Sequence, residues 1–130
     1  MHILDFNKLS LRDINKTLQE SDKNSFFSIR NPKGSHALAV GINKKITVKV
    51  VGSVGYYCAG MNKFSDIKVE GSAGPGLGEN IMSGNIHVTG DVSQYAGAPP
   101  KPIKTIYNYD PQGINLKKDA FKGGGLSREE

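Results

Sequence analysis

The 130-residue chain contains no tryptophan and a single cysteine, Cys58. One cysteine excludes an intramolecular disulfide, a CxxC redox pair and a cluster held by several cysteines. No apolar run approaches the roughly 20 residues that a membrane helix needs. The N-terminal stretch MHILDFNKLSLRD lacks the basic and then apolar segments of a secretory signal. We therefore expect one globular domain in the cytoplasm.

Basic residues are spread along the chain rather than gathered in one segment. The formal net charge is +5, and residues 1–98 carry eleven Lys or Arg and eight Asp or Glu. Adjacent basic pairs occur only at Lys44-Lys45 and Lys117-Lys118. This distribution favours a solvated surface, with an acidic protein as the partner class. A nucleic-acid-binding module that uses the basic tail is the less favoured alternative.

Residues 1–28 contain one helical signal. Ser10 is a candidate N-cap, and Asp13 stands three residues later in the capping-box position. Leu11, Ile14 and Leu18 then fall on one face at helical spacing. A short helix with one apolar stripe needs a surface to cover, so we expect residues 1–28 to form a cap.

The main pattern is a repeat of 19 residues. The segments VKVVGSVG (48–55), IKVEGSAG (67–74) and IHVTGDVS (86–93) align without gaps. Each unit has two apolar residues two positions apart, followed by a glycine: Gly52, Gly71 and Gly90. A constant period near 20 with one strand pattern per unit is typical of a solenoid. An earlier, looser copy is expected to begin near Ile29.

The repeat predicts an all-β fold with a short N-terminal helix. Residues 29–98 would form a right-handed parallel β-helix of about three to four coils, with the recurring glycines at its corners. Two ladders of inward side chains are expected, Val48/Ile67/Ile86 and Val50/Val69/Val88. The residues between them, Lys49, Lys68 and His87, would point to solvent.

Residues 99–130 break the pattern. Prolines at 99, 100 and 102 cannot donate to a strand ladder, and no further Val-x-Val-x-Gly unit follows. We expect an irregular, flexible tail over residues 99–130.

The stretch GSAGPGLGENIMSG (71–84) is rich in glycine but lacks the context of a phosphate loop. It has no Gly-Lys-Ser/Thr ending, and its spacing is G-x-G-x-G rather than G-x-G-x-x-G. We therefore predict that Gly74, Gly76 and Gly78, like Gly52, Gly71 and Gly90, are structural corner glycines. No catalytic, cofactor-binding or metal-binding residue is predicted.

Cys58 is the candidate nucleophile of an alternative hypothesis, in which the chain is a small enzyme that uses Cys58 or His87. A catalytic cysteine needs a base and a lowered pKa, and none of His2, His36 and His87 stands at a known spacing from it. We instead expect Cys58 to pack as a small apolar residue.

Five residues are candidates for a protein interface. Tyr57 and Tyr95 stand two periods apart, Tyr56 precedes Tyr57, and Arg30 and Lys33 flank the turn at Pro32. Tyrosine suits both stacking between coils and partner interfaces. Arg30 and Lys33 could contact an acidic partner.

The phrases RNPKGSHALAVG, VGSVGYYCAGM, GSAGPGLGENIMSG and VTGDVSQYAGA resemble the GXGXG β-helix domain of the glutamate synthase large subunit. The closer resemblance is to the stand-alone glutamate-synthase-like subunit of N-methylglutamate synthase, and it covers roughly residues 1–98. It implies a structural subunit without catalytic residues or a cofactor of its own. The implied partners are a synthase subunit with FMN and an iron–sulphur cluster, and a glutamine amidotransferase-like subunit, with no nucleic acid and no membrane.

Two alternatives stay open within this resemblance. The same domain type occurs in a subunit of formylmethanofuran dehydrogenase, so the chain could belong to a complex of that type. Family members also continue for several coils beyond the position of Pro99. A truncated or frameshifted fragment without function, or a form adapted to a smaller complex, therefore remains an alternative.

Overall fold

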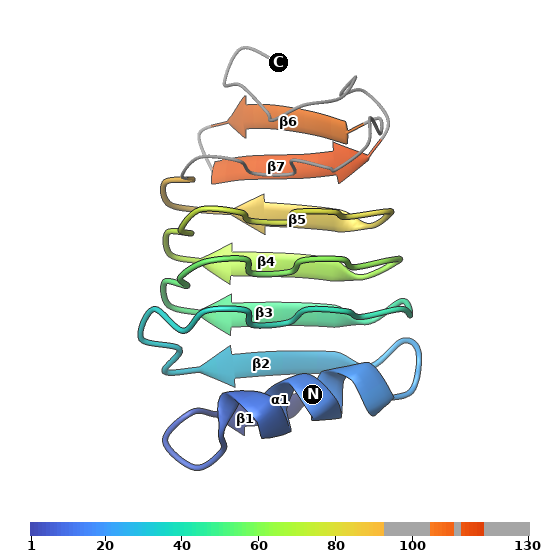
Figure 1. Cartoon of the computed structure of the whole chain (residues 1–130), viewed down its shortest axis with the longest axis vertical. Helices are drawn as coiled ribbons and strands as arrows, with labels where there is room; N and C mark the ends of the chain where they lie inside the picture. The colour runs from blue at the N-terminus through green and yellow to red at the C-terminus, as the bar shows by residue number, and fades with distance from the viewer. Residues whose placement is uncertain (93–104, 111–112, 119–130) are drawn as a thin grey trace.

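The computed structural model describes the backbone of residues 1–92, 105–110 and 113–118, and the side chains of residues 1–92. Seven strands form one sheet in the order β1-β2-β3-β4-β5-β7-β6. Figure 1 shows these strands stacked one above another, with the helix α1 at the N-terminal end of the stack. The elements are β1 (His2–Asp5), α1 (Leu11–Glu20), β2 (Phe26–Arg30), β3 (Thr47–Val51), β4 (Asp66–Glu70), β5 (Asn85–Val88), β6 (Thr105–Asp110) and β7 (Gly113–Lys118).

Strands β2 to β5 pair in parallel, in the register that the 19-residue repeat predicts. Because side chains alternate along a strand, every second residue of each strand enters the core. Two buried rows result, Phe27/Val48/Ile67/Ile86 and Ile29/Val50/Val69/Val88. The predicted parallel β-helix is therefore confirmed, and the looser copy expected near Ile29 is β2.

Between strands, each coil runs through turns on the side of the core opposite the sheet (Figure 1). We call residues 36–41, 56–61 and 75–80 the turn wall. Every second residue of the wall has a positive φ, at equivalent positions in the three coils: Ala37/Tyr57/Gly76, Ala39/Ala59/Gly78 and Gly41/Met61/Asn80.

Backbone hydrogen bonds join the turn wall from coil to coil. The N–H of Ala59 donates to the Leu38 carbonyl of the preceding coil at 2.9 Å. The N–H of Tyr57 donates to Pro75 of the following coil at 2.8 Å. Between wall and sheet lies a closed core that includes Leu38, Ile42, Cys58, Leu77 and Ile81.

Helix α1 covers the N-terminal end of this core, as predicted. The Ser10 hydroxyl accepts a hydrogen bond from the Asp13 N–H at 3.1 Å, which satisfies one of the free donors of the first turn. Ile14 and Leu18 are fully buried, and Leu11 packs against the same cluster. Among the described residues, no helix is long and apolar enough to cross a membrane.

Two segments form strands that the sequence analysis did not assign. Strand β1 pairs in parallel with β2 and places Leu4 opposite Ile29, while Ile3 faces out. Within the range predicted to be an irregular tail, β7 pairs antiparallel with both β5 and β6. The prolines at 99, 100 and 102 precede these two strands, so they occupy none of their ladder positions. The remainder of residues 99–130 lies outside the described residues.

Candidate functional site

Gly52, Gly71 and Gly90 lie one above another where successive coils leave the sheet. A Cβ on Gly71 would lie 2.6 Å from the Gly52 carbonyl carbon, and one on Gly90 would lie 2.7 Å from the Gly71 oxygen. The N–H of Gly90 donates to that same oxygen at 2.8 Å. Glycine is required here because neighbouring coils approach too closely for a side chain.

The G-x-G-x-G run lies in and beside the turn wall rather than at the Gly52/Gly71/Gly90 corner. Gly76 and Gly78 have φ angles of 77° and 63°. A Cβ on Gly74 would lie 2.9 Å from the carbonyl carbon of Gly55 in the preceding coil. The N–H groups of Gly74 and Gly78 donate to Gly55 and Cys58 at 3.2 and 2.7 Å. These two amides therefore bind neighbouring backbone and are not directed at a phosphate.

Cys58 is a core residue. Its side chain is fully buried, and burial raises the pKa of its thiol to about 12. The thiolate is the reactive form, so this thiol stays protonated and inert at neutral pH. The expectation that Cys58 packs as a small apolar residue is confirmed.

The histidines hold structural positions. The His36 ring stacks on Tyr56 with centroids 4.1 Å apart, and its Nδ1 accepts a hydrogen bond from the Tyr56 N–H at 2.9 Å. His87 lies half-buried on β5 in register with Lys68, on the outward row where the repeat places it. In residues 1–92, no group of three or more His, Cys, Asp or Glu side chains could hold a metal ion.

The candidate interface residues are distributed over two regions. Arg30 ends β2, and Lys33 is exposed in the following turn, 3.4 Å from the Asn7 amide oxygen. Tyr56 is 58% exposed and stacks on His36, whereas Tyr57 lies half-buried in the turn wall. Tyr95 lies outside the described residues.

Beside Arg30, the carboxylate of Asp5 is held by two hydrogen bonds. Its Oδ1 accepts from Asn31 Nδ2 at 2.9 Å and from the Asn7 N–H at 2.8 Å. These bonds, the one from Asn31 above all, keep the pKa of Asp5 below its ordinary value. The interaction ties the end of β1 to the turn that follows β2.

Two asparagines that the sequence analysis did not single out support the turn wall. Asn15 on α1 donates from Nδ2 to the Ala37 carbonyl at 2.8 Å and accepts from the Ala39 N–H at 2.7 Å. Its amide thus replaces the peptide group that a preceding coil would supply. Asn62 is fully buried and joins the Ile42 N–H to the Ala39 carbonyl. An amide side chain beside the apolar stripe of a cap helix is the signal that could have identified Asn15.

Comparison with known proteins gives one relative. Protein GlxC of Rhizobium meliloti (strain 1021) is 50% identical to the chain over 89 residues, which are 66% of this chain and 39% of that protein. This chain is a homologue of GlxC. No family model matches the chain, and no solved structure matches it. Because the matched segment spans only 39% of GlxC, it corresponds to part of that longer protein.

Proposed function

We propose that this chain is a non-catalytic structural subunit of a glutamate synthase-like complex of the N-methylglutamate synthase type. In this role it holds together a synthase-type subunit, which contains FMN and an iron–sulphur cluster, and a glutamine amidotransferase-like subunit. The cofactors belong to the partner, and the solenoid supplies a rigid surface.

The observation that carries the structural role is how the glycine-rich run is used. Gly74 and Gly78 direct their N–H groups into the coil below, and the Gly71 position admits no side chain. Its one thiol is buried with a pKa of about 12, and His36 Nδ1 already accepts a backbone hydrogen bond. These groups maintain the stack of coils, which supports a scaffold rather than an enzyme.

The type of complex is proposed from sequence likeness. The phrases that resemble the GXGXG domain fall on the solenoid, in the coils of β2 to β5 and their turns. The homology with GlxC, at 50% identity over 89 residues, extends over two thirds of the chain. Both likenesses support a glutamate synthase-like subunit, and the partners follow from that class of complex.

The test is affinity purification of the tagged full-length chain from the organism that encodes it. We expect a coloured eluate with flavin and iron–sulphur absorbance, and identification of a synthase-type and an amidotransferase-type protein by mass. A colourless eluate that contains the chain alone would contradict the proposal.

A further inference from the structure

Two large side chains occupy strained backbone positions in the turn wall. Tyr57 and Met61 have φ angles of 60° and 57°, in the left-handed region that disfavours side chains with a Cβ. The equivalent positions in the neighbouring coils hold smaller residues, Ala37 and Gly76 for Tyr57, and Gly41 and Asn80 for Met61. The same wall is therefore built elsewhere without a large side chain. Strain kept at such positions points to a role outside folding.

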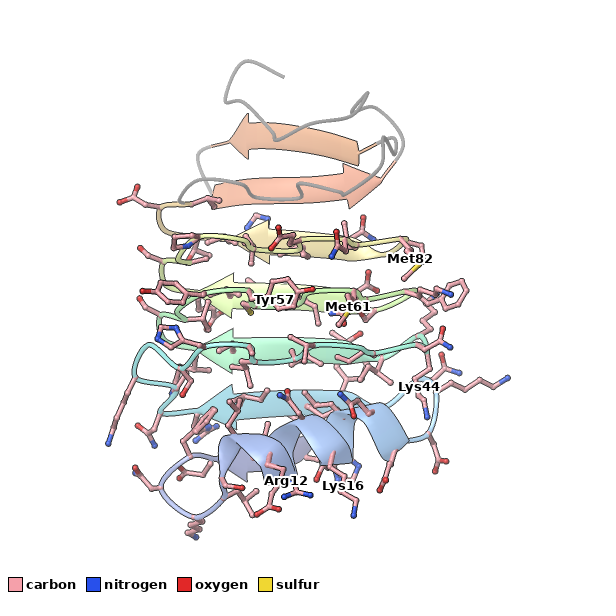
Figure 2. The ribbon with its side chains drawn as sticks, in the orientation of Figure 1. Arg12, Lys16, Lys44, Tyr57, Met61 and Met82 are labelled. Carbon is pink, nitrogen blue, oxygen red and sulfur yellow. The ribbon has the colours of Figure 1, made fainter. Side chains whose placement is uncertain are left out.

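The two side chains lie on the outer side of the wall (Figure 2). The Tyr57 ring lies over Gly60, where a Cβ would be 2.6 Å from its Cζ, and its hydroxyl is 3.5 Å from Asn80 Nδ2. The ring is thus fixed along the wall. Met61 is 46% exposed, and Met82 is exposed beside the wall. A fixed aromatic ring next to adaptable methionines suits the apolar centre of a protein interface.

Cations border this apolar group on the helix side. Arg12 and Lys16 are one helical turn apart and exposed on α1, whose Asn15 is hydrogen-bonded to the lowest coil of the wall (Figure 2). Lys44 lies at the side, where its ammonium donates to the Ser21 carbonyl. Within residues 1–92, the ion pairs are those of Lys49 and Lys68 with Glu70, on the sheet. Arg12 and Lys16 therefore face solvent without a carboxylate in contact.

We propose that this surface is the docking site for a partner subunit whose own surface has an apolar hollow bordered by acidic residues. We name it the wall face and define it as Tyr57, Met61 and Met82 with Arg12, Lys16 and Lys44. The apolar side chains fill the hollow, and the cations meet the acidic border. Charge complementarity selects the partner and speeds encounter, while the buried centre supplies most of the affinity. The inference rests on the proposed function, because it assigns a surface to the partner contact.

The experiment compares variants of the tagged full-length chain, purified from the host, by the amount of partner protein and flavin recovered per tagged chain. Met61→Asn places the residue of the next coil at this φ, and Arg12→Glu/Lys16→Glu reverses the cations. The matched control, Lys49→Glu/Lys68→Glu, makes the same charge change on the outer face of the sheet. Urea unfolding of each purified variant reports the fold separately.

We expect Met61→Asn and Arg12→Glu/Lys16→Glu to reduce partner recovery at least about tenfold, as for central interface residues. The control should stay within about twofold of the unmodified chain. Met61→Asn should unfold at the same urea concentration or a higher one, since asparagine tolerates the left-handed conformation. Loss of binding without loss of stability is the result that a merely structural Met61 would not give.

Three outcomes overturn the inference. Wall-face variants that recover partner within about twofold of the unmodified chain would leave the proposed function standing and the docking site wrong. A drop in recovery that accompanies a lower unfolding midpoint for Met61→Asn would make Met61 structural. An equal loss in the sheet-face control would show a general effect of charge. If the unmodified chain recovers no partner, the proposed function itself fails.

Discussion

Replacing Gly71 with alanine would place a methyl group against the backbone of the neighbouring coil. The added Cβ would lie 2.6 Å from the Gly52 carbonyl carbon, and 2.7 Å from both the Gly52 oxygen and the Ser53 nitrogen. Ordinary contacts begin near 3.4 Å. Both coils are held by backbone hydrogen bonds, including Gly52 N–H to Glu70 at 3.0 Å, so the atoms cannot rotate away. The two coils must move apart.

We expect Gly71→Ala to lower the free energy of unfolding by about 2 kcal/mol, within the usual range for overpacking a tight site. The φ of Gly71 is not in the left-handed region, so the loss comes from the clash alone. Urea unfolding followed by far-UV circular dichroism measures the change. Amide hydrogen exchange should also quicken at Gly52 and Val54, whose N–H groups bond to the coil of Gly71.

Gly34→Ala is the matched control. Gly34 has a φ of 74° and no atom within 4 Å of an added Cβ, so only backbone strain changes there. It should lower stability by about 1 kcal/mol and leave hydrogen exchange at the Gly52 corner unchanged. If Gly71→Ala unfolds at the same urea concentration as the unmodified chain, the assignment of Gly71 to a closed corner is wrong.

The thiol of Cys58 should not react with a thiol reagent at pH 7 until the chain unfolds, because burial raises its pKa to about 12; labelling of the native chain within minutes would contradict this. Ser65→Ala should stabilise the fold by roughly 1 kcal/mol in urea unfolding, since the buried Ser65 hydroxyl has no hydrogen-bond partner among the described residues. A destabilised variant would show that the hydroxyl is bonded. Asn15→Ala should cost about 2 kcal/mol because it leaves two wall groups unpaired, and an unchanged midpoint would refute the peptide-like role of its amide. Asp5→Asn should flatten the fall in stability below about pH 4: a carboxylate with a lowered folded pKa stabilises the fold above its unfolded pKa and loses that effect as the pH drops. An unchanged acid titration would contradict that prediction.

The sheet could be predicted from the sequence because its determinants are local. Val48 and Val50 alternate with a lysine, and the pattern returns after 19 residues with Ile67 and Val69. Alternation gives the inward face, and the constant spacing gives the register between coils. The helix was equally accessible, since Ser10 is a cap by chemistry and the stripe has helical spacing.

The turn wall was less accessible because hydrogen bonds between coils determine its conformation. The spacing of two between Gly76 and Gly78 does carry a signal, since it matches the alternation of positive φ along the wall. In the preceding coil, Tyr57 and Ala59 hold the same conformations without any glycine. Local propensity would place neither residue in the left-handed region.

The cap and the C-terminal strands illustrate the same division. Asn15 matters because its amide meets Ala37 and Ala39, residues more than twenty positions away, and no local pattern announces that contact. Strands β6 and β7 pair antiparallel, with β7 against β5, so they fall outside a repeat of parallel units. The wall face likewise joins residues of α1 to residues of the third coil, which only the fold brings together.

The most direct test of the scaffold role is to tag the amidotransferase-type subunit in cells with and without this chain. Recovery of the synthase-type subunit and its flavin with the tag is then measured. The account predicts that the synthase-type subunit is recovered when the chain is present and is lost when it is absent. Equal recovery in both cells would show that the two subunits associate without this solenoid, and would contradict the central claim.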